Sequence, residues 1–153
     1  MMQKRPVHLL VFLSMMCVFL GPSMFSSPAL ADGEKVKVLY HVDTRDLATA
    51  KYAMALINKH IEAEGGPDNI DVKLVVHGPA LPLFDAETVD PGLKAKLKTI
   101  IDKGVDAEMC QVSMKLFGKP LDKLVAGFKP TEHPVAVKRI ADLQKEGYIY
   151  IKP

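Results

Sequence analysis

Short apolar runs typical of β-strands alternate along this chain with longer segments whose apolar positions recur every three or four residues, as in helices. Strands are predicted at residues 36–42, 72–77, 105–109, 126–129 and 148–151. Helices are predicted from Asp43 or Thr44 to Gly65, from Pro91 to Gly104, over 111–117 and over 134–147, with one further turn at 121–125. Residues 80–89 are expected to form an ordered loop.

Two helices carry recognisable start signals. Either Asp43 or Thr44 is expected to cap the first helix, and Asp90 the second, where Pro91 stands at the favoured first position. In the last helix the pattern predicts one buried face, made of Val137, Ile140, Ala141 and Gln144.

The regular alternation of strands and helices predicts an α/β fold. We expect a flavodoxin-like three-layer sandwich, with a mainly parallel five-stranded sheet between helices. In such sheets ligands and reactive groups gather at the carboxyl ends of the strands. His41, His77 and Cys110 end the first three predicted strands, so all three are expected at one edge of the sheet.

Residues 1–31 have the organisation of a secretory signal peptide. Lys4 and Arg5 precede an apolar run at 9–20, and Ala29-Leu30-Ala31 resembles a small-residue cleavage site. The run is shorter than a membrane-spanning helix requires. We therefore predict a periplasmic or otherwise secreted protein, off the membrane after cleavage, with a single domain at 32–153.

Charge and cysteine content narrow the function classes further. The predicted leader holds two of the 20 basic residues and none of the 18 acidic ones, so the remaining domain is close to neutral. Nucleic-acid binding is not expected, because it normally requires a basic excess. Cys110 is the only cysteine outside the leader, so the domain cannot form an internal disulfide.

Cys110 is the first candidate for chemistry. It lies where a predicted strand meets a predicted helix, and the unpaired N–H groups of a helix start favour a thiolate. The alternative is a buried cysteine that serves only as a small apolar core residue. Position in the sequence does not decide between them.

The second group of candidates surrounds the first two strand ends. His77 is a candidate catalytic residue together with Cys110, and it precedes Gly78-Pro79, which allows a sharp turn beside a ligand. His41 is a candidate for ligand binding, although it fits a structural role at least as well. Asp43 and Arg45 follow the first strand and are candidates for ligand binding. Zinc motifs such as C-x-x-C and H-x-x-x-H are missing, and so are phosphate-binding glycine motifs, so no metal or cofactor is predicted.

The order of several short motifs resembles the DsrE/DsrF-like family of sulfur-relay proteins. The motifs are residues 35–41, residues 75–81, Gly104-Val105 with a cysteine five residues beyond Val105, and the closing segment 141–153. The resemblance implies a flavodoxin-like domain that assembles as a homo-oligomer, a trimer or hexamer, and receives sulfur as a persulfide on Cys110. His77 matches a strand-end motif without an established role. Unlike the best-known relay proteins, which are cytoplasmic, this chain has a predicted export signal.

Three hypotheses follow. In the first, the protein is a sulfur carrier or sulfurtransferase-like protein that exchanges sulfur with donor and acceptor proteins through Cys110. In the second, it is a non-catalytic module that binds a small ligand or a protein near His41 and His77. In the third, copper or zinc is held by His41, His77 and Cys110. We favour the first, because the position of the thiol and the family resemblance agree.

Overall fold

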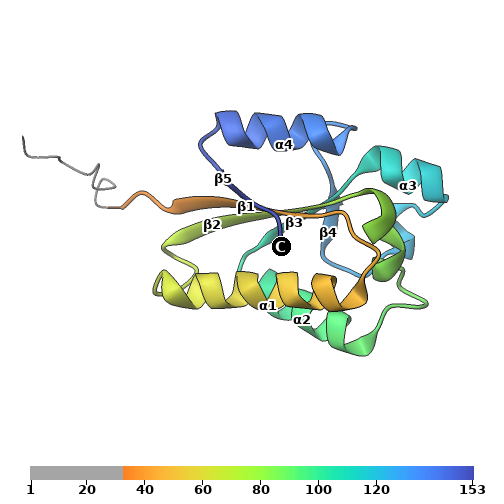
Figure 1. Ribbon diagram of the computed structural model, residues 1–153, viewed down its shortest axis with the longest axis horizontal. Helices are drawn as coiled ribbons and strands as arrows, with labels where there is room; N and C mark the ends of the chain where they lie inside the picture. The colour runs from red at the N-terminus through yellow and green to blue at the C-terminus, as the bar shows by residue number, and fades with distance from the viewer. Residues whose placement is uncertain (1–32) are drawn as a thin grey trace, which may run out of the picture.

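The computed structural model describes residues 33–153, which form one parallel sheet with helices on both faces (Figure 1). The predicted signal peptide at 1–31 lies outside the described residues. The strands are β1 (Val36–Val42), β2 (Ile70–Val76), β3 (Asp106–Met109), β4 (Phe128–Pro130) and β5 (Ile149–Ile151). The α-helices are α1 (Leu47–Ala63), α2 (Pro91–Asp102), α3 (Gln111–Phe117) and α4 (Ala136–Lys145), and two short 3-10 helices are η1 (Gly78–Phe84) and η2 (Leu121–Lys123).

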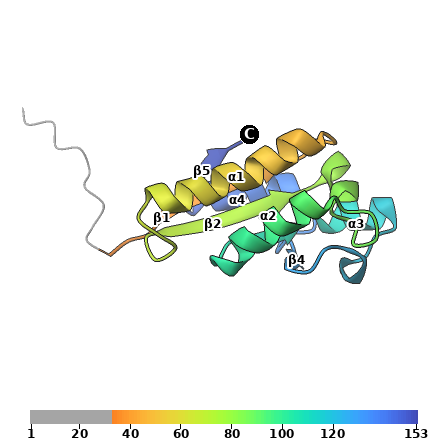
Figure 2. The same ribbon diagram turned by 90° about the horizontal axis from the view of Figure 1, so that it is seen from below.

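The order in which strands are added to the sheet reverses at the first strand, because β2 lies on one side of β1 and β5 on the other. The sheet runs β4-β3-β2-β1-β5, and every neighbouring pair is parallel. Helices α1 and α2 cover one face, whereas α4 crosses the other face to bring the chain to β5 (Figures 1 and 2). The predicted α/β sandwich is confirmed. The carboxyl ends of the strands beside such a reversal, here β1 and β5, are the place where such sheets usually bind ligands.

Alternation along the strands divides the core into two layers. Val38 and Tyr40 of β1 belong to the larger apolar cluster, which includes the buried residues of α1 and α2. Leu39 belongs to a smaller cluster, with Cys110 and residues of α4. Because successive side chains of a strand point to opposite faces, His41 shares the face of Leu39. The small cluster therefore adjoins the candidate residues.

One of the two predicted helix starts is correct. Asp90 caps α2, accepting a hydrogen bond from the N–H of Leu93 at 2.9 Å. The cap of α1 is Asp46, which accepts from Ala48 and Thr49, and not Asp43 or Thr44. Four residues, 43–46, lie between β1 and the start of the helix at Leu47. Asp43 is thereby left free for another role.

The predicted buried face of the last helix is correct at Ile140 and wrong at Val137 and Gln144, which are exposed. Val137 is 61% exposed, and the buried residues of α4 are Ala136, Arg139, Ile140 and Leu143. The physical reason is a charged residue on the inward face. The guanidinium of Arg139 is buried because it donates two hydrogen bonds to Glu108 of β3, at 3.0 and 2.9 Å. Apolar periodicity alone cannot reveal such a pair.

Other differences are local. The expected loop at 80–89 begins inside η1, which packs Ala80, Leu81 and Phe84 into the core. Strand ends shift by at most two residues from the predicted bounds, and those of β1 do not shift. None of the helices among residues 33–153 is long and apolar enough to cross a membrane.

Candidate functional site

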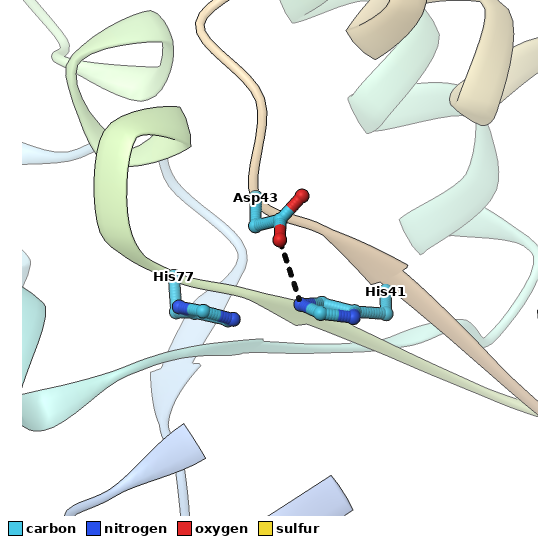
Figure 3. Close-up of side chains that lie close together, drawn as sticks. All are labelled: His41, Asp43 and His77. Carbon is cyan, nitrogen blue, oxygen red and sulfur yellow. Dashed lines mark ion pairs between the residues drawn. The ribbon is translucent and has the colours of Figure 1, made fainter. Parts of the chain in front are cut away.

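Two histidines meet at the carboxyl edge of the sheet. His41 of β1 pairs in register with Val75 of β2. His77 directly follows β2 and lies two residues after Val75, so it points to the same face of the sheet. Their ring planes are inclined by only 14° and their centroids are 4.8 Å apart, and Figure 3 shows the two rings side by side. The prediction that both histidines lie at one sheet edge is confirmed, and their rings are also in contact.

Asp43 completes a compact cluster with the two rings. Its Oδ2 lies 3.8 Å from Nε2 of His41, and the carboxylate points toward that ring (Figure 3). One ligand-type atom from each of His41, Asp43 and His77 falls within 4.8 Å of the others. The sulfur of Cys110 does not belong to this group.

The last strand and the residue that follows it supply two partners that sequence reasoning missed. The hydroxyl of Tyr150 lies 2.7 Å from Nδ1 of His41, and Nζ of Lys152 donates to Oδ2 of Asp43 at 2.8 Å. Only the pairing of β5 beside β1 brings these residues together. The alternating Tyr-Ile-Tyr-Ile sequence at 148–151 could have suggested that the two tyrosines share one face of a strand, but not which strand they meet.

The cluster contains two polar atoms without a hydrogen-bond partner. Nε2 of His41 and Nε2 of His77 are both buried, and neither has a partner among the described residues. The side chain of His41 is only 8% exposed. Buried polar atoms are normally paired, so these two nitrogens require an explanation.

Burial keeps both rings neutral. Burial, followed by the neighbouring His77, lowers the pKa of His41 to about 4, while Asp43 acts in the opposite direction. The pKa of His77 is also lowered, chiefly by burial. Partial burial acts to raise the pKa of Asp43, but the hydrogen bond from Lys152 and the neighbouring His41 bring it below its usual value. At neutral pH the cluster therefore holds two neutral imidazoles beside a carboxylate.

Cys110 stands at the junction of β3 and α3, as predicted. It is the N-cap residue of α3, and its N–H donates to the carbonyl of Val76 at 3.0 Å, which ties it to the end of β2. The thiol is 4% exposed and packs in the small cluster with Ala136 and Leu143 of α4. At rest, the thiol is therefore covered.

The cover is the segment at 131–135, which is fastened to the strand end and to α3. Thr131 donates its N–H to the carbonyl of Met109, and its own carbonyl accepts from the Gln111 amide at 2.6 Å. The carbonyl of Pro134 accepts from the N–H of Val112 at 3.2 Å and from the Cys110 thiol at 3.5 Å. Access to the sulfur requires this segment to move.

The turn beyond His77 has the sharp geometry expected from its sequence. Gly78 has a φ of +55°, a left-handed conformation that favours glycine. Its N–H donates to the buried hydroxyl of Ser113 at 2.7 Å, which joins η1 to α3. Arg45, predicted as a ligand-binding residue, is exposed and forms no ion pair with Asp43.

Comparison with known proteins adds a family match. The model of the DsrE/DsrF-like family matches residues 35–153, which include every element of the fold. A comparison with curated proteins gives no significant match.

Several solved structures are similar in fold. The protein MTH1491 of Methanobacterium thermoautotrophicum, described as of unknown function, superposes with a TM-score of 0.67 at 18% identity, over 78% of this chain and 100% of its own. The ychN protein of E. coli gives 0.59 at 11% identity, over 78% and 99% of the two chains. BT1422 of Bacteroides thetaiotaomicron, also of unknown function, gives 0.52 at 15% identity, over 76% and 94%. At these identities the likeness concerns the fold.

Proposed function

Because the chain belongs to the DsrE/DsrF-like family, we propose that it carries sulfane sulfur as a persulfide on Cys110. The observation that carries the proposal is the place of the thiol. Cys110 directly follows β3 as the N-cap of α3, at the carboxyl edge where parallel sheets gather their reactive groups. A thiol at the start of a helix lies at the positive end of the helix dipole, which favours a negative charge.

The transfer step is a thiol–disulfide type of exchange. The Cys110 thiolate attacks the outer sulfur of a donor persulfide, forming a new S–S bond as the donor's S–S bond breaks and the donor thiolate leaves. A thiolate of an acceptor then attacks the outer sulfur on Cys110, which returns the cysteine to its thiolate. Each step exchanges one S–S bond for another, so no external oxidant or reductant is consumed.

In this proposal the covering segment at 131–135 acts as a gate that controls access to the Cys110 thiol. The thiol donates to the carbonyl of Pro134, so this contact and the neighbouring bond from Gln111 to Thr131 must open before a donor can reach the sulfur. A covered thiol is protected from nonspecific oxidation between transfers. Because the hydrogen-bond partner of the thiol is a backbone carbonyl and the ring of His77 stacks on His41, we assign His77 no proton transfer with Cys110.

Export and self-assembly form part of the same proposal. The leader predicted at 1–31 would deliver the domain to the periplasm or beyond the cell. Assembly as a homo-oligomer is supported by apolar side chains on the outer surface near the gate. Leu116 is 77% exposed and Val112 48%, four residues apart on α3, while Val135 and Val137 at the start of α4 are 41% and 61% exposed.

Release of bound sulfur tests the proposed function. The purified protein is incubated with a low-molecular-weight persulfide donor, desalted and treated with dithiothreitol, and the sulfide that is released is measured. We expect a stoichiometric amount from the wild-type chain and only background from Cys110→Ser. Equal release from both proteins, or background release from both, would contradict the proposal.

A further inference from the structure

The unpartnered Nε2 atoms of His41 and His77 take no part in the proposed sulfur transfer. We propose that His41, His77 and Asp43 form a binding site for a divalent transition-metal ion of the zinc type. The sequence did not predict a metal site, because it contains no common zinc motif. The three residues come from two adjacent strand ends and one following turn, so their sequence spacing resembles no common metal motif. The site is independent of the proposed sulfur chemistry because Cys110 is not one of its ligands.

The donor set suits such an ion. Two neutral imidazoles and a carboxylate are the ligands of many zinc and iron sites, with one or more positions left for water or an exchangeable anion. Hard ions such as Mg²⁺ prefer oxygen ligands and are poorly served by two imidazoles. Both rings are neutral at pH 7, as metal binding requires, because burial lowers their pKa values.

The arrangement of His41 is that of an oriented ligand. Its Nδ1 lies 2.7 Å from the hydroxyl of Tyr150. When Nδ1 donates this hydrogen bond, Nε2 presents its lone pair to the cluster. Metal-binding histidines commonly donate their second nitrogen to such a partner, which fixes the tautomer and the ring orientation. The same tautomer explains why Nε2 has no hydrogen-bond partner in the protein.

To bind one ion, the ligand atoms of His41, His77 and Asp43 must move closer together. Ligand atoms at about 2.1 Å from one zinc ion lie ~3.4 Å apart in tetrahedral geometry. In the structure Nε2 of His41 and Oδ2 of Asp43 are 3.8 Å apart, and the whole set lies within 4.8 Å. Rotations of the side chains are required to close this gap, and His77 approaches His41 from the neighbouring strand and Asp43 from the turn above (Figure 3).

The positive charge of Lys152 is expected to weaken binding of the metal ion. Its ammonium group is bonded to the Oδ2 atom of Asp43 that faces His41. A divalent cation must compete with this lysine for the carboxylate and experiences its positive charge. Removing the charge in Lys152→Gln is therefore expected to strengthen binding, an effect that a purely structural role of the cluster would not produce.

Calorimetric titration with Zn²⁺ tests the site. After treatment with a chelator, the wild-type protein is expected to bind one Zn²⁺ per chain, and Mg²⁺ is expected to give no heat of binding. His77→Gln and Asp43→Asn should each weaken the Zn²⁺ affinity by at least about tenfold, whereas Lys152→Gln should increase it. Asp43 is only partly buried, so its variant keeps the test valid if a histidine variant unfolds.

Three control variants separate this site from other thiols and histidines. Cys110→Ser, His60→Gln and His133→Gln are expected to bind Zn²⁺ like the wild type. Failure of Cys110→Ser in the sulfide-release assay with unchanged Zn²⁺ binding would support both proposals. The metal site is contradicted by failure to bind stoichiometric Zn²⁺, by unchanged affinity in His77→Gln and Asp43→Asn, or by loss of affinity in any control variant.

Discussion

The guanidinium of Arg139 is held against the carboxylate of Glu108 in the interior of the protein. Two of its nitrogens donate to this carboxylate, and the two side chains are 5% and 0% exposed. Glu108 precedes Cys110 by two residues on the same face of β3, so the pair anchors α4 beside the proposed sulfur site. Glu132 and Glu146 also lie within ion-pair distance of Arg139, which further fixes the helix.

Removing one partner of this pair should destabilise the fold strongly. Arg139→Met leaves the Glu108 carboxylate buried without its cation, at an expected cost of about 3–5 kcal/mol in the free energy of unfolding. Urea denaturation measures the loss. Lys138→Met is the matched control, because its pair with Asp142 is exposed and is expected to contribute less than about 1 kcal/mol. Similar losses in the two variants would contradict the structural role of Arg139.

Stability should depend on pH through His41. The folded chain holds the pKa of this ring at about 4, against 6.5 as its ordinary value. Between these two pH values the unfolded chain binds a proton that the folded chain does not, so stability falls as the pH falls. The loss contributed by His41 approaches about 3 kcal/mol near pH 4.

Denaturation of the metal-free protein at several pH values, with a chelator present, measures this dependence. His41→Gln removes the titrating group and should show a shallower decline between pH 6.5 and 4. Carboxylates such as Asp43 and Asp106, whose pKa values are lowered, lose their contributions at still lower pH in both proteins. Parallel pH profiles for the two proteins would show that His41 is not responsible.

The covering segment should limit the reactivity of the thiol. Gln111→Ala removes one hydrogen bond that fastens residue 131, and a bond of this kind contributes about 1 kcal/mol. We therefore expect alkylation of native Cys110 by iodoacetamide to accelerate about fivefold. Lys115→Ala, a change at an exposed position of the same helix, serves as the control. An unchanged rate in Gln111→Ala would mean that another movement exposes the sulfur.

Assembly should depend on the apolar surface of α3. Leu116 is the most exposed large apolar side chain of the described residues, and a charge at this position would be buried in any interface that covers it. Leu116→Asp is expected to shift the protein from oligomer to monomer in sedimentation velocity, without loss of the fold. Tyr52→Asp changes an exposed side chain on α1, away from this surface, and should leave assembly intact. A monomeric wild-type protein would contradict the proposed assembly.

Local patterns predicted the fold well because most elements carry their own signals. The apolar run of β1, the Asp90-Pro91 start of α2 and the extent of α3 are all visible in the sequence and agree with the structure. The inward face of α4 could not be found in this way, because Arg139 is buried only through a partner 31 residues away. Its burial depends on tertiary structure.

The candidate site was predicted only in part, because some of its contacts also depend on tertiary structure. Strand ends placed His41, His77 and Cys110 at one edge, since parallel strands bring their carboxyl ends together. The sequence did not show that the two rings stack or that Tyr150 and Lys152 reach them, because these contacts depend on the pairing of β5 with β1. Nor did it show that residues 131–135 cover the thiol.

The central claim is that Cys110 accepts sulfur, and peptide mass spectrometry tests it most directly. After exposure to a persulfide donor, the thiols are alkylated, the protein is digested and the peptide containing Cys110 is identified. We predict an addition of about 32 Da, one sulfur atom, on Cys110, which disappears after treatment with an acceptor thiol. A Cys110 peptide that stays unmodified in folded protein, under conditions that convert a free model thiol, would contradict the account.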